Sequence, residues 1–486
     1  MTDFPTHPRP PLRRRAGAPD DRPFGAPRSG LIVAALLAFL PVAAAAQPSP
    51  APSLHDRAIA AGYKAAMLCS GIFNARAART ERTRESIEAN ELKGIYPEYD
   101  ALAGAMPAEI GDRKVVVRYD PAMPGRVAVS ATLGGCTTLP IGAPEATAAT
   151  TTIIRARHSM TMTWPRGDDD APAQPLRALR PALDSAFGGA YGAGSNTTGV
   201  VIVRDGKLVA ERYADGFGPL TPQRTWSVAK SIAGTIVGIA VRKGLVDPRA
   251  PAPVPEWQKP GDPRAAITLD NLLRMASGLH SDTAGNRSDA IYFGGTAVTE
   301  QTVTWPLEVP PGTRFRYANN DILLAIRALR SKVPPNWHGD DALFASEMLF
   351  DELRMDRTFA ERDWQGNYIL SSQVWSTARD LARIGQFWLD DGVNYTTRIL
   401  PEGWMKYMTT PSGPQPATGP GYGATMWLFG PAQGLPEGSY AAQGNRGQFV
   451  MVIPSRRLVI VRRGEDPGAA RFDIARFTAD VLAALK

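Results

Sequence analysis

The sequence is poor in the residues that build metal centres. It contains 2 Cys and 5 His in 486 residues, and neither a Cys-x-x-Cys nor a His-x-His pattern occurs. Because a protein zinc site needs several such ligands at close spacing, we predict no metal ion. The glycines of 188–199 do not follow the Gly-x-Gly-x-x-Gly spacing, so they predict a turn and no cofactor. No Gly-x-Ser-x-Gly motif occurs, which argues against a hydrolase of the Ser-His-Asp type.

A dense cluster of positive charge is missing as well. The formal net charge is +7, and the basic residues form no stripe with interleaved aromatic residues. Nucleic acid is therefore not a predicted partner. Hydrophobic residues make up 44% of the chain and charged residues 21%, a balance that excludes both a membrane bundle and a disordered chain.

Long apolar runs are confined to the N-terminus, where residues 1–46 have the features of a signal peptide. Arginines at positions 13–15 precede the apolar run Leu31–Leu40, and Ala44-Ala45-Ala46 fits a cleavage site before Gln47. An uncleaved anchor is the alternative, although an apolar stretch of about 16 residues is short for a membrane span. We predict a periplasmic or secreted protein with no stable membrane span after removal of the signal.

Cys69 and Cys136 are the only cysteines of the chain. In an oxidising compartment they are predicted to form a disulfide, and two buried free thiols are the alternative. Cys69 ends a segment of helical character, 55–68, whereas Cys136 follows a strand-like pair, 114–119 and 126–131. The disulfide would therefore join two elements that lie far apart in the sequence.

Composition divides the remaining chain into an N-terminal extension, 47–175, and a larger domain, 176–486. A segment rich in Pro and Asp closes the extension. We interpret its Asp168-Asp169-Asp170 run as a solvated linker, with a site for a hard cation as the alternative. Whether the extension covers a functional site or only stabilises the fold is left open at this stage.

Two predicted hairpins frame the larger domain. Residues 200–204 and 207–213 flank Asp205-Gly206, a dipeptide typical of tight hairpins, and 448–453 and 458–463 form the second pair. Helical periodicity dominates the chain between them and also follows the second hairpin, at 269–275, 322–329, 378–389 and 472–485. We predict an α+β fold, with an antiparallel β-sheet flanked by helices and a helical subdomain.

Ser227 and Lys230 begin a helix that is apolar on nearly all sides. The apolar residues of 231–243 predict that this helix lies in the protein interior. A spacing of three residues places Ser227 and Lys230 on one face, and burial disfavours the charged form of lysine. The pair therefore indicates a serine nucleophile with a basic partner. The alternative is a capping serine beside a lysine that extends to solvent.

Tyr317 and Asn319 form the only Tyr-x-Asn of the chain. A Tyr317 phenolate near Ser227 would accept the serine proton, provided that a cation such as Lys230 lowers the tyrosine pKa by about three units. The alternative is a buried tyrosine whose hydroxyl has a structural hydrogen bond.

These motifs resemble the serine β-lactamase and penicillin-binding-protein superfamily over residues 197–486. Within it, they are most similar to the branch of class C β-lactamases, family VIII esterases, D-aminopeptidases and 6-aminohexanoate-dimer hydrolases. The matching segments, in order, are Ser227–Lys230, Leu272–Leu279, Pro311-Gly312, Tyr317–Asn319, Ser376–Arg383, Gly421–Gly423 and Gly444–Gln448. The resemblance implies a β-lactamase/transpeptidase-like fold.

The resemblance also implies roles for individual residues. Ser227 would be the nucleophile, Lys230 its proton-transfer partner and Tyr317 the general base and acid. Asn319 would orient the substrate or Lys230. Gln443, Gly444 and Asn445 would line the substrate site, and the Asn445 N–H would form an oxyanion hole with that of Ser227.

One position departs from the pattern of the β-lactamases. They carry Lys-Thr-Gly or His-Thr-Gly where this sequence has Ala442-Gln443-Gly444, so the cation that binds a substrate carboxylate is missing. Whether Arg446 replaces it is open. The expectation is an exported serine hydrolase that cleaves small amides or esters through an acyl-enzyme. The alternatives are a class C-type β-lactamase or D-alanyl carboxypeptidase, and a catalytically silent module that binds peptidoglycan or protein.

Overall fold

The computed structural model describes residues 51–132, 134–148, 162–280, 288–334 and 344–486. The predicted signal peptide, 1–46, lies outside these residues. Residues 52–486 form one compact unit, so the boundary proposed at residue 175 stays a prediction. Within the described residues, no helix combines the length and apolar character needed to cross a membrane.

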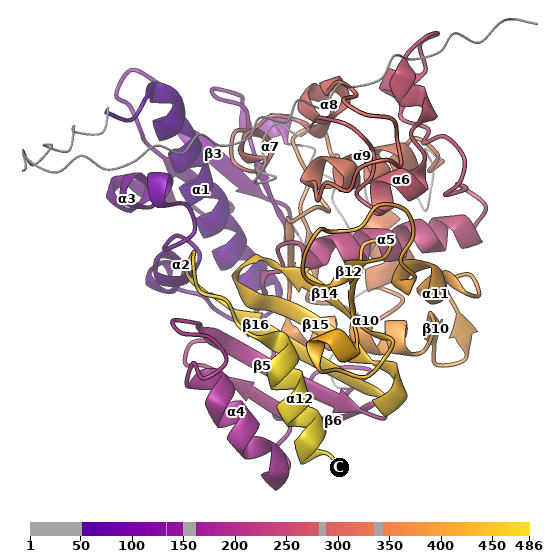
Figure 1. The fold of residues 1–486 in the computed structure, drawn as a ribbon. Helices are drawn as coiled ribbons and strands as arrows, with labels where there is room; N and C mark the ends of the chain where they lie inside the picture. Colours follow the sequence, from indigo (N-terminus) through magenta and orange to yellow (C-terminus); the bar gives the residue numbers. More distant parts are fainter. Residues whose placement is uncertain (1–50, 133, 149–161, 281–287, 335–343) are drawn as a thin grey trace, which may run out of the picture. The chain divides into compact units, whose positions relative to one another are not determined.

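A seven-stranded antiparallel sheet forms the centre of this unit (Figure 1). Its strand order is β12-β13-β14-β15-β16-β5-β6. The two predicted hairpins, β5–β6 and β15–β16, supply four of its strands. The bounds are β12 (Gly421–Tyr422), β13 (Trp427–Phe429), β14 (Ser439–Gly444), β15 (Gln448–Ile453), β16 (Leu458–Gly464), β5 (Thr197–Arg204) and β6 (Lys207–Tyr213).

Helices cover both faces of this sheet, because its central strands are apolar on both sides. Val200 and Ile202 pack with α4 (Arg180–Phe187) and α12 (Ile474–Ala484), while the alternate residue Val201 packs on the opposite face with α5 and α10. Successive residues of a strand point to opposite faces, so one strand serves two cores. The bounds of the two helices on the second face are α5 (Val228–Arg242) and α10 (Ala378–Leu389).

The helical subdomain lies between β6 and β12 in the sequence, as predicted. Its helix α5 has every residue from Val228 to Ala240 buried, in agreement with its apolar sequence. The other helices are α6 (Leu269–Leu273), α7 (Asp289–Tyr292), α8 (Val298–Gln301), α9 (Asn319–Arg330) and α11 (Trp404–Thr409). Short strands complete it, with β7 (Gln223–Arg224), β8 (Phe359–Ala360) and β9 (Val374–Ser376) in one sheet and β10 (Val393–Asn394) and β11 (Thr397–Arg398) in another. The α+β prediction is confirmed.

The N-terminal extension packs against this subdomain through a shared core. Its helix α1 (Leu54–Ala77) contacts a four-stranded antiparallel sheet, β1-β2-β3-β4. The same apolar cluster includes Phe293, Leu323 and Trp375 from the larger domain. The remaining bounds are α2 (Arg84–Asn90), α3 (Pro97–Ala105), β1 (Ala108–Ile110), β2 (Lys114–Val117), β3 (Arg126–Ser130) and β4 (Cys136–Thr138).

The predicted disulfide is present between Cys69 and Cys136. It joins α1 to β4. The helix continues to Ala77, so the expectation that Cys69 ends a helix is wrong. The buried face of α1 extends past the cysteine, and this tertiary packing sustains the additional turns.

The interpretation of Asp168-Asp169-Asp170 as a solvated linker holds for Asp169, which is exposed, but is wrong for Asp168 and in part for Asp170. The Asp168 side chain is 2% exposed and forms ion pairs with Arg357 and, at 2.7 Å, with Arg383. Asp170 pairs with Arg379 at 3.0 Å. A buried carboxylate is stable only when its charge is compensated, and arginines from α10 and from the loop before β8 provide that compensation.

We expect removal of the disulfide to lower the free energy of unfolding. The two cysteines are 67 residues apart, and closing a loop of this length contributes about 4 kcal/mol in the chain-entropy model. Urea unfolding of the Cys69→Ser/Cys136→Ser variant should show a lower midpoint than oxidised wild type. Wild type under reducing conditions is the control and should match the variant. Equal midpoints for oxidised wild type and the variant would contradict this expectation.

Candidate active site

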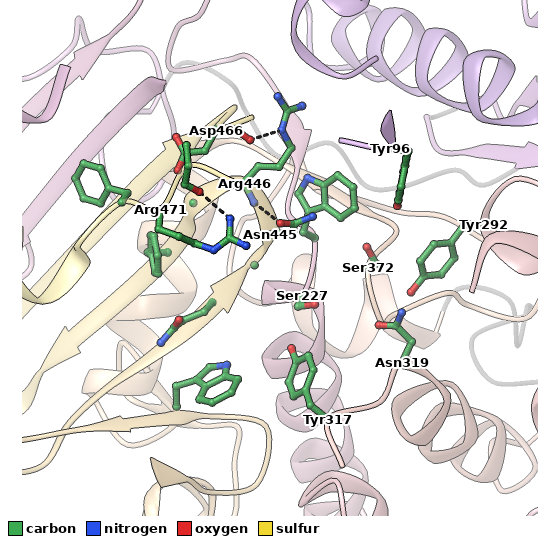
Figure 2. Close-up of a pocket in the computed structure, with 18 of the residues that line it drawn as sticks. Tyr96, Ser227, Tyr292, Tyr317, Asn319, Ser372, Asn445, Arg446, Asp466 and Arg471 are labelled. Atoms are coloured by element: carbon green, nitrogen blue, oxygen red, sulfur yellow. Dashed lines mark hydrogen bonds between the residues drawn. The ribbon is translucent and has the colours of Figure 1, made fainter. Parts of the chain in front are cut away.

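A pocket of about 550 Å³ opens at the N-terminus of α5 (Figure 2). It brings together six of the seven predicted site residues. The seventh, Lys230, is buried next to Ser227 and does not line the pocket. The predicted residues in its wall are Ser227, Tyr317, Asn319, Gln443, Gly444 and Asn445.

Ser227 is placed by a sharp turn between β7 and α5. Thr225 N donates to Val374 O at 2.8 Å, which ends the strand pairing, and Trp226 then has a φ of +51°. Such a backbone is rare for a large side chain and persists only where its surroundings hold it. The Arg224 guanidinium lies 3.7 Å from the Trp226 ring centre and provides such a contact. The alternative of a capping serine fails, since the Ser227 side chain caps no described helical N–H.

Lys230 has three hydrogen-bond acceptors around its amine. Its Nζ donates to Ser227 Oγ at 2.9 Å, to Asn319 Oδ1 at 2.7 Å and to Ser371 O at 2.8 Å. The residue is 1% exposed. Burial, together with the nearby Arg224 cation, lowers the pKa of Lys230 to about 7. The alternative of a lysine that extends to solvent is therefore wrong.

These acceptors determine where a neutral Lys230 directs its lone pair. A neutral amine has two N–H groups and one lone pair. Ser371 O accepts hydrogen bonds only, and so does the amide oxygen of Asn319. When these two atoms take both N–H groups, the lone pair faces the Ser227 hydroxyl. The arrangement suits a base that accepts the proton of Ser227.

Tyr317 lies on the other side of Ser227. Its hydroxyl shares a hydrogen bond with that of Ser227, while burial raises the pKa of Tyr317 to about 12. The ring centre is 5.0 Å from Lys230 Nζ, and the ring packs against Tyr422 and Trp427. The expectation that Lys230 lowers the tyrosine pKa is therefore wrong. Desolvation disfavours the Tyr317 phenolate and also the Lys230 ammonium that would stabilise it.

The end of β14 passes directly beside Ser227. A Cβ on Gly444 would lie 2.4 Å from Thr225 O and 3.0 Å from Ser227 N, so this close approach requires glycine. Gln443 lines the pocket, and its buried Nε2 has no hydrogen-bond partner among the described residues. Ala442 is fully buried in the core against which Tyr317 also packs. It brings no positive charge to the site.

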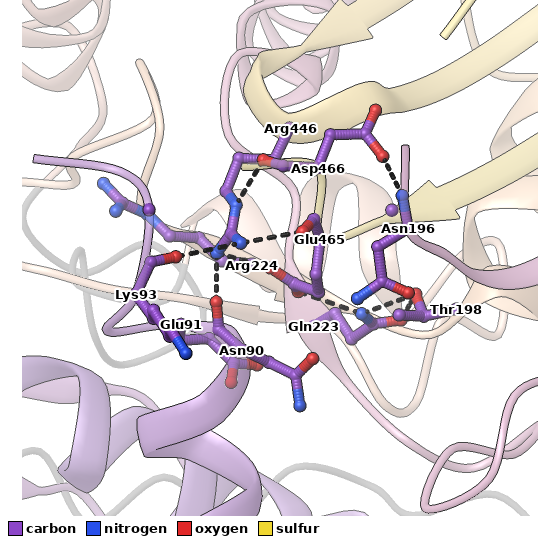
Figure 3. Close-up of polar contacts among 12 residues, drawn as sticks. Asn90, Glu91, Lys93, Asn196, Thr198, Gln223, Arg224, Arg446, Glu465 and Asp466 are labelled. Carbon is purple, nitrogen blue, oxygen red and sulfur yellow. Dashed lines mark hydrogen bonds and ion pairs between the residues drawn. The ribbon is translucent and has the colours of Figure 1, made fainter. Parts of the chain in front are cut away.

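Arg446 does not replace the missing cation (Figure 3). Its guanidinium pairs with Glu465 at 2.8 Å and donates to the backbone oxygens of Asp466 and Asn90. The side chain is 4% exposed. These bonds direct the guanidinium toward the N-terminal extension, so its charge is neutralised before it can bind a substrate.

Sequence reasoning missed several residues of this site. Tyr96, Trp226, Tyr292, Ser372 and Arg471 line the pocket, while Arg224 and Ser371 lie behind it. Trp226 directly precedes Ser227 and Arg224 lies three residues before it, so their closeness to the serine in the sequence was a signal. Tyr96 and the pair Ser371-Ser372 carry no local motif, and only the tertiary fold brings them to Ser227.

Comparison with known proteins identifies the family. The family described as Beta-lactamase matches residues 177–484. This chain belongs to the β-lactamase family. It is 30% identical over 308 residues to a 6-aminohexanoate-dimer hydrolase from Paenarthrobacter ureafaciens, covering 56% of this chain and 73% of the relative. The resemblance derived from the motifs is confirmed, and the chain is a hydrolase of the serine type found in this family.

Solved structures show the same fold. A candidate 6-aminohexanoate-dimer hydrolase from Bacillus anthracis superposes with a TM-score of 0.52 at 20% identity, covering 65% of this chain and 88% of that chain. A family VIII carboxylesterase superposes with a TM-score of 0.50 at 13% identity, covering 65% and 99%. At such identities the likeness establishes the β-lactamase/transpeptidase-like fold alone.

The pKa of Lys230 leads to a prediction about pH. If neutral Lys230 is the proton acceptor, kcat/KM for an ester rises with pH through about 7 and then levels, because the amine loses its proton there. The apparent pKa is that of Lys230, because Tyr317 stays protonated in this range. In the Arg224→Gln variant, loss of the neighbouring cation raises the Lys230 pKa and moves the rising limb to higher pH. A profile that is flat or falls between about pH 6 and pH 8 would contradict this assignment.

Proposed function

We propose that this protein is an exported serine hydrolase that cleaves amide or ester bonds of small molecules through an acyl-enzyme on Ser227. The observation that carries the proposal is the 2.9 Å contact between Lys230 Nζ and Ser227 Oγ in a pocket that also holds Tyr317 and Asn319. Export rests on the signal features of residues 1–46 and implies a periplasmic or secreted location. The Cys69–Cys136 disulfide supports an oxidising compartment.

In the acylation step, Ser227 Oγ attacks the substrate carbonyl while neutral Lys230 takes its proton. Negative charge then develops on the carbonyl oxygen. The backbone N–H groups of Ser227 and Asn445 are the donors we assign to this oxygen, supported by the approach of Gly444 to Ser227 N. Ser227 also stands at the N-terminus of α5, where the helix dipole favours negative charge.

Tyr317 carries the proton onward to the leaving group. Its hydroxyl bonds to Ser227 and remains protonated at neutral pH, since its pKa is about 12. It can therefore donate its own proton to the departing amine or alkoxide while it takes up the proton that Lys230 removed from Ser227. We therefore assign to Lys230 the general-base role expected for Tyr317. Tyr317 acts as the general acid that protonates the leaving group. A water molecule then repeats the sequence on the acyl-enzyme.

The missing charge at Ala442 favours substrates without a carboxylate next to the scissile bond. Linear amides and simple esters fit this description better than penicillins or peptidoglycan stem peptides do. The 30% identical relative named 6-aminohexanoate-dimer hydrolase supports a linear amide. A catalytically silent binding module is disfavoured, because Ser227, Lys230 and Tyr317 all remain and lie in contact.

Removal of any one catalytic group should abolish most of the activity. For one p-nitrophenyl ester, we expect Ser227→Ala and Lys230→Ala to approach the background rate, and Tyr317→Phe to lose about 10²–10⁴-fold in kcat. Because the groups act as a unit, double variants should lose little more. The surface variant Tyr395→Phe is the control. A fluorophosphonate should label Ser227 in wild type and fail to label Ser227→Ala; labelling elsewhere would refute the nucleophile.

Substrate preference tests the role of position 442. We expect nitrocefin to be hydrolysed with a kcat/KM at least about tenfold below that of p-nitrophenyl butyrate, because no cation at Ala442 binds the β-lactam carboxylate. The Ala442→Lys variant should raise the nitrocefin-to-ester ratio if it folds, which its thermal unfolding will show. Rapid nitrocefin turnover with poor ester cleavage by wild type would favour a β-lactamase instead.

A further inference from the structure

Part of the pocket wall comes from the N-terminal extension, outside the family domain. The family match begins at residue 177, whereas Tyr96 lines the same pocket as Ser227. Figure 2 shows Tyr96 and Tyr292 on one side of Ser227, and Asn445 and Arg471 on the other. The extension therefore reaches the reaction site and contributes a side chain to it.

Neighbouring residues fix both the backbone and the ring of Tyr96. The Asp100 carboxylate accepts from Gly94 N at 2.6 Å and from Tyr96 N at 3.3 Å. The ring lies in an aromatic cluster, 5.2 Å from the Tyr63 ring and 5.8 Å from that of Phe293. A side chain fixed in this way forms a wall, since it cannot move aside for a larger ligand at low cost.

The aromatic cluster continues from Tyr96 to the residue before the nucleophile. The rings of Tyr96 and Trp226 have centres 6.5 Å apart, and Tyr292 adds a third ring to the pocket lining. Its hydroxyl bonds to Ser371 Oγ at 2.6 Å, in the residue whose carbonyl accepts from Lys230. One side of the pocket is therefore aromatic, and one of its three rings, Tyr96, comes from the extension.

A clamp formed by Arg446 joins the extension to the loop that carries Asn445. The guanidinium bonds to the carbonyl oxygens of Asn90 and Lys93 on one side and to Glu465 on the other (Figure 3). Lys93 lies three residues before Tyr96. The clamp thus fixes the distance between the aromatic wall and the proposed oxyanion hole, and with it the length available to a substrate.

We infer that Tyr96 is a specificity-determining residue that limits the size of the substrate group on the aromatic side of the pocket. The wall favours flat or unbranched apolar groups, which pack against rings at low cost, and excludes branched ones. The inference rests on the proposed function, because it assumes that substrates react at Ser227. It assigns to the extension a role in substrate choice in addition to its contribution to the core.

Two series of esters test this inference on the full protein. In the first, the acyl group of p-nitrophenyl esters grows from acetyl through butyryl to the branched pivaloyl group. In the second, the acyl group stays acetyl and the alcohol part grows from a small group to a longer one and then to a branched one. For each series we compare kcat/KM for the branched ester with kcat/KM for the smallest ester. We expect Tyr96→Ala to raise this ratio by about tenfold in one of the two series. The series that responds shows which part of the substrate faces Tyr96.

Conservative and distant variants separate specificity from stability. Tyr96→Phe keeps the ring and should retain the wild-type ratio, whereas Tyr395→Ala, an exposed residue of the β10–β11 turn, should change neither ratio nor rate. Arg446→Gln loosens the clamp and should shift the ratio in the same direction as Tyr96→Ala. If Tyr96→Ala lowers kcat/KM equally for all esters, or leaves both ratios unchanged, the inference is overturned.

Failure of the inference is distinguishable from failure of the proposed function. Fluorophosphonate labelling of Ser227 at the wild-type rate in Tyr96→Ala shows an intact nucleophile, so an unchanged ratio then refutes only the role of Tyr96. Esterase activity that survives in Ser227→Ala refutes the proposed function itself.

Discussion

The site depends on a lysine amine that is kept out of water. In solution, an amine of this kind is protonated at neutral pH, and a protonated amine cannot accept the proton of a serine. Burial of Lys230, with Arg224 nearby, lowers its pKa to about 7, which is what the base we propose requires. The cost of that burial is offset by three hydrogen bonds, so the fold must deliver three acceptors to one point.

Those acceptors come from three separate parts of the chain. Ser227 stands at the start of α5, Asn319 at the start of α9, and Ser371 in the loop before β9. The central sheet supports α5 on one face, and β14 meets the start of α5 at Gly444. Each contact needs close approach of backbone segments. This is why the site combines a glycine, a strained residue before the nucleophile and a helix that is buried on all sides.

Most predictions that the structure confirms came from local sequence patterns. Most errors concerned contacts between residues that lie far apart in the sequence. The hairpins and the apolar helix after Ser227 follow from periodicity, and the Ser227–Lys230 contact follows from helix geometry. The solvated interpretation of Asp168 failed because its arginine partners lie about 190 to 215 residues further along. The pKa of Tyr317 was misjudged for a related reason: the number of rings that bury its hydroxyl cannot be read from a Tyr-x-Asn motif.

Arg446 shows how the extension and the family domain depend on each other. Beside the proposed oxyanion hole, an unpaired arginine would attract anionic substrates. Arg446 is instead neutralised by Glu465 and donates to carbonyl groups of the extension. Arg446 is neutralised and Ala442 is uncharged. Among the described residues of β14 and the turn that follows it, no free positive charge therefore remains near the end of the strand. Arg471 still lines the pocket, but recognition at the end of β14 itself falls to shape and apolar contact. On one side the pocket is limited by the ring of Tyr96. This ring belongs to the same extension whose carbonyl groups accept hydrogen bonds from Arg446.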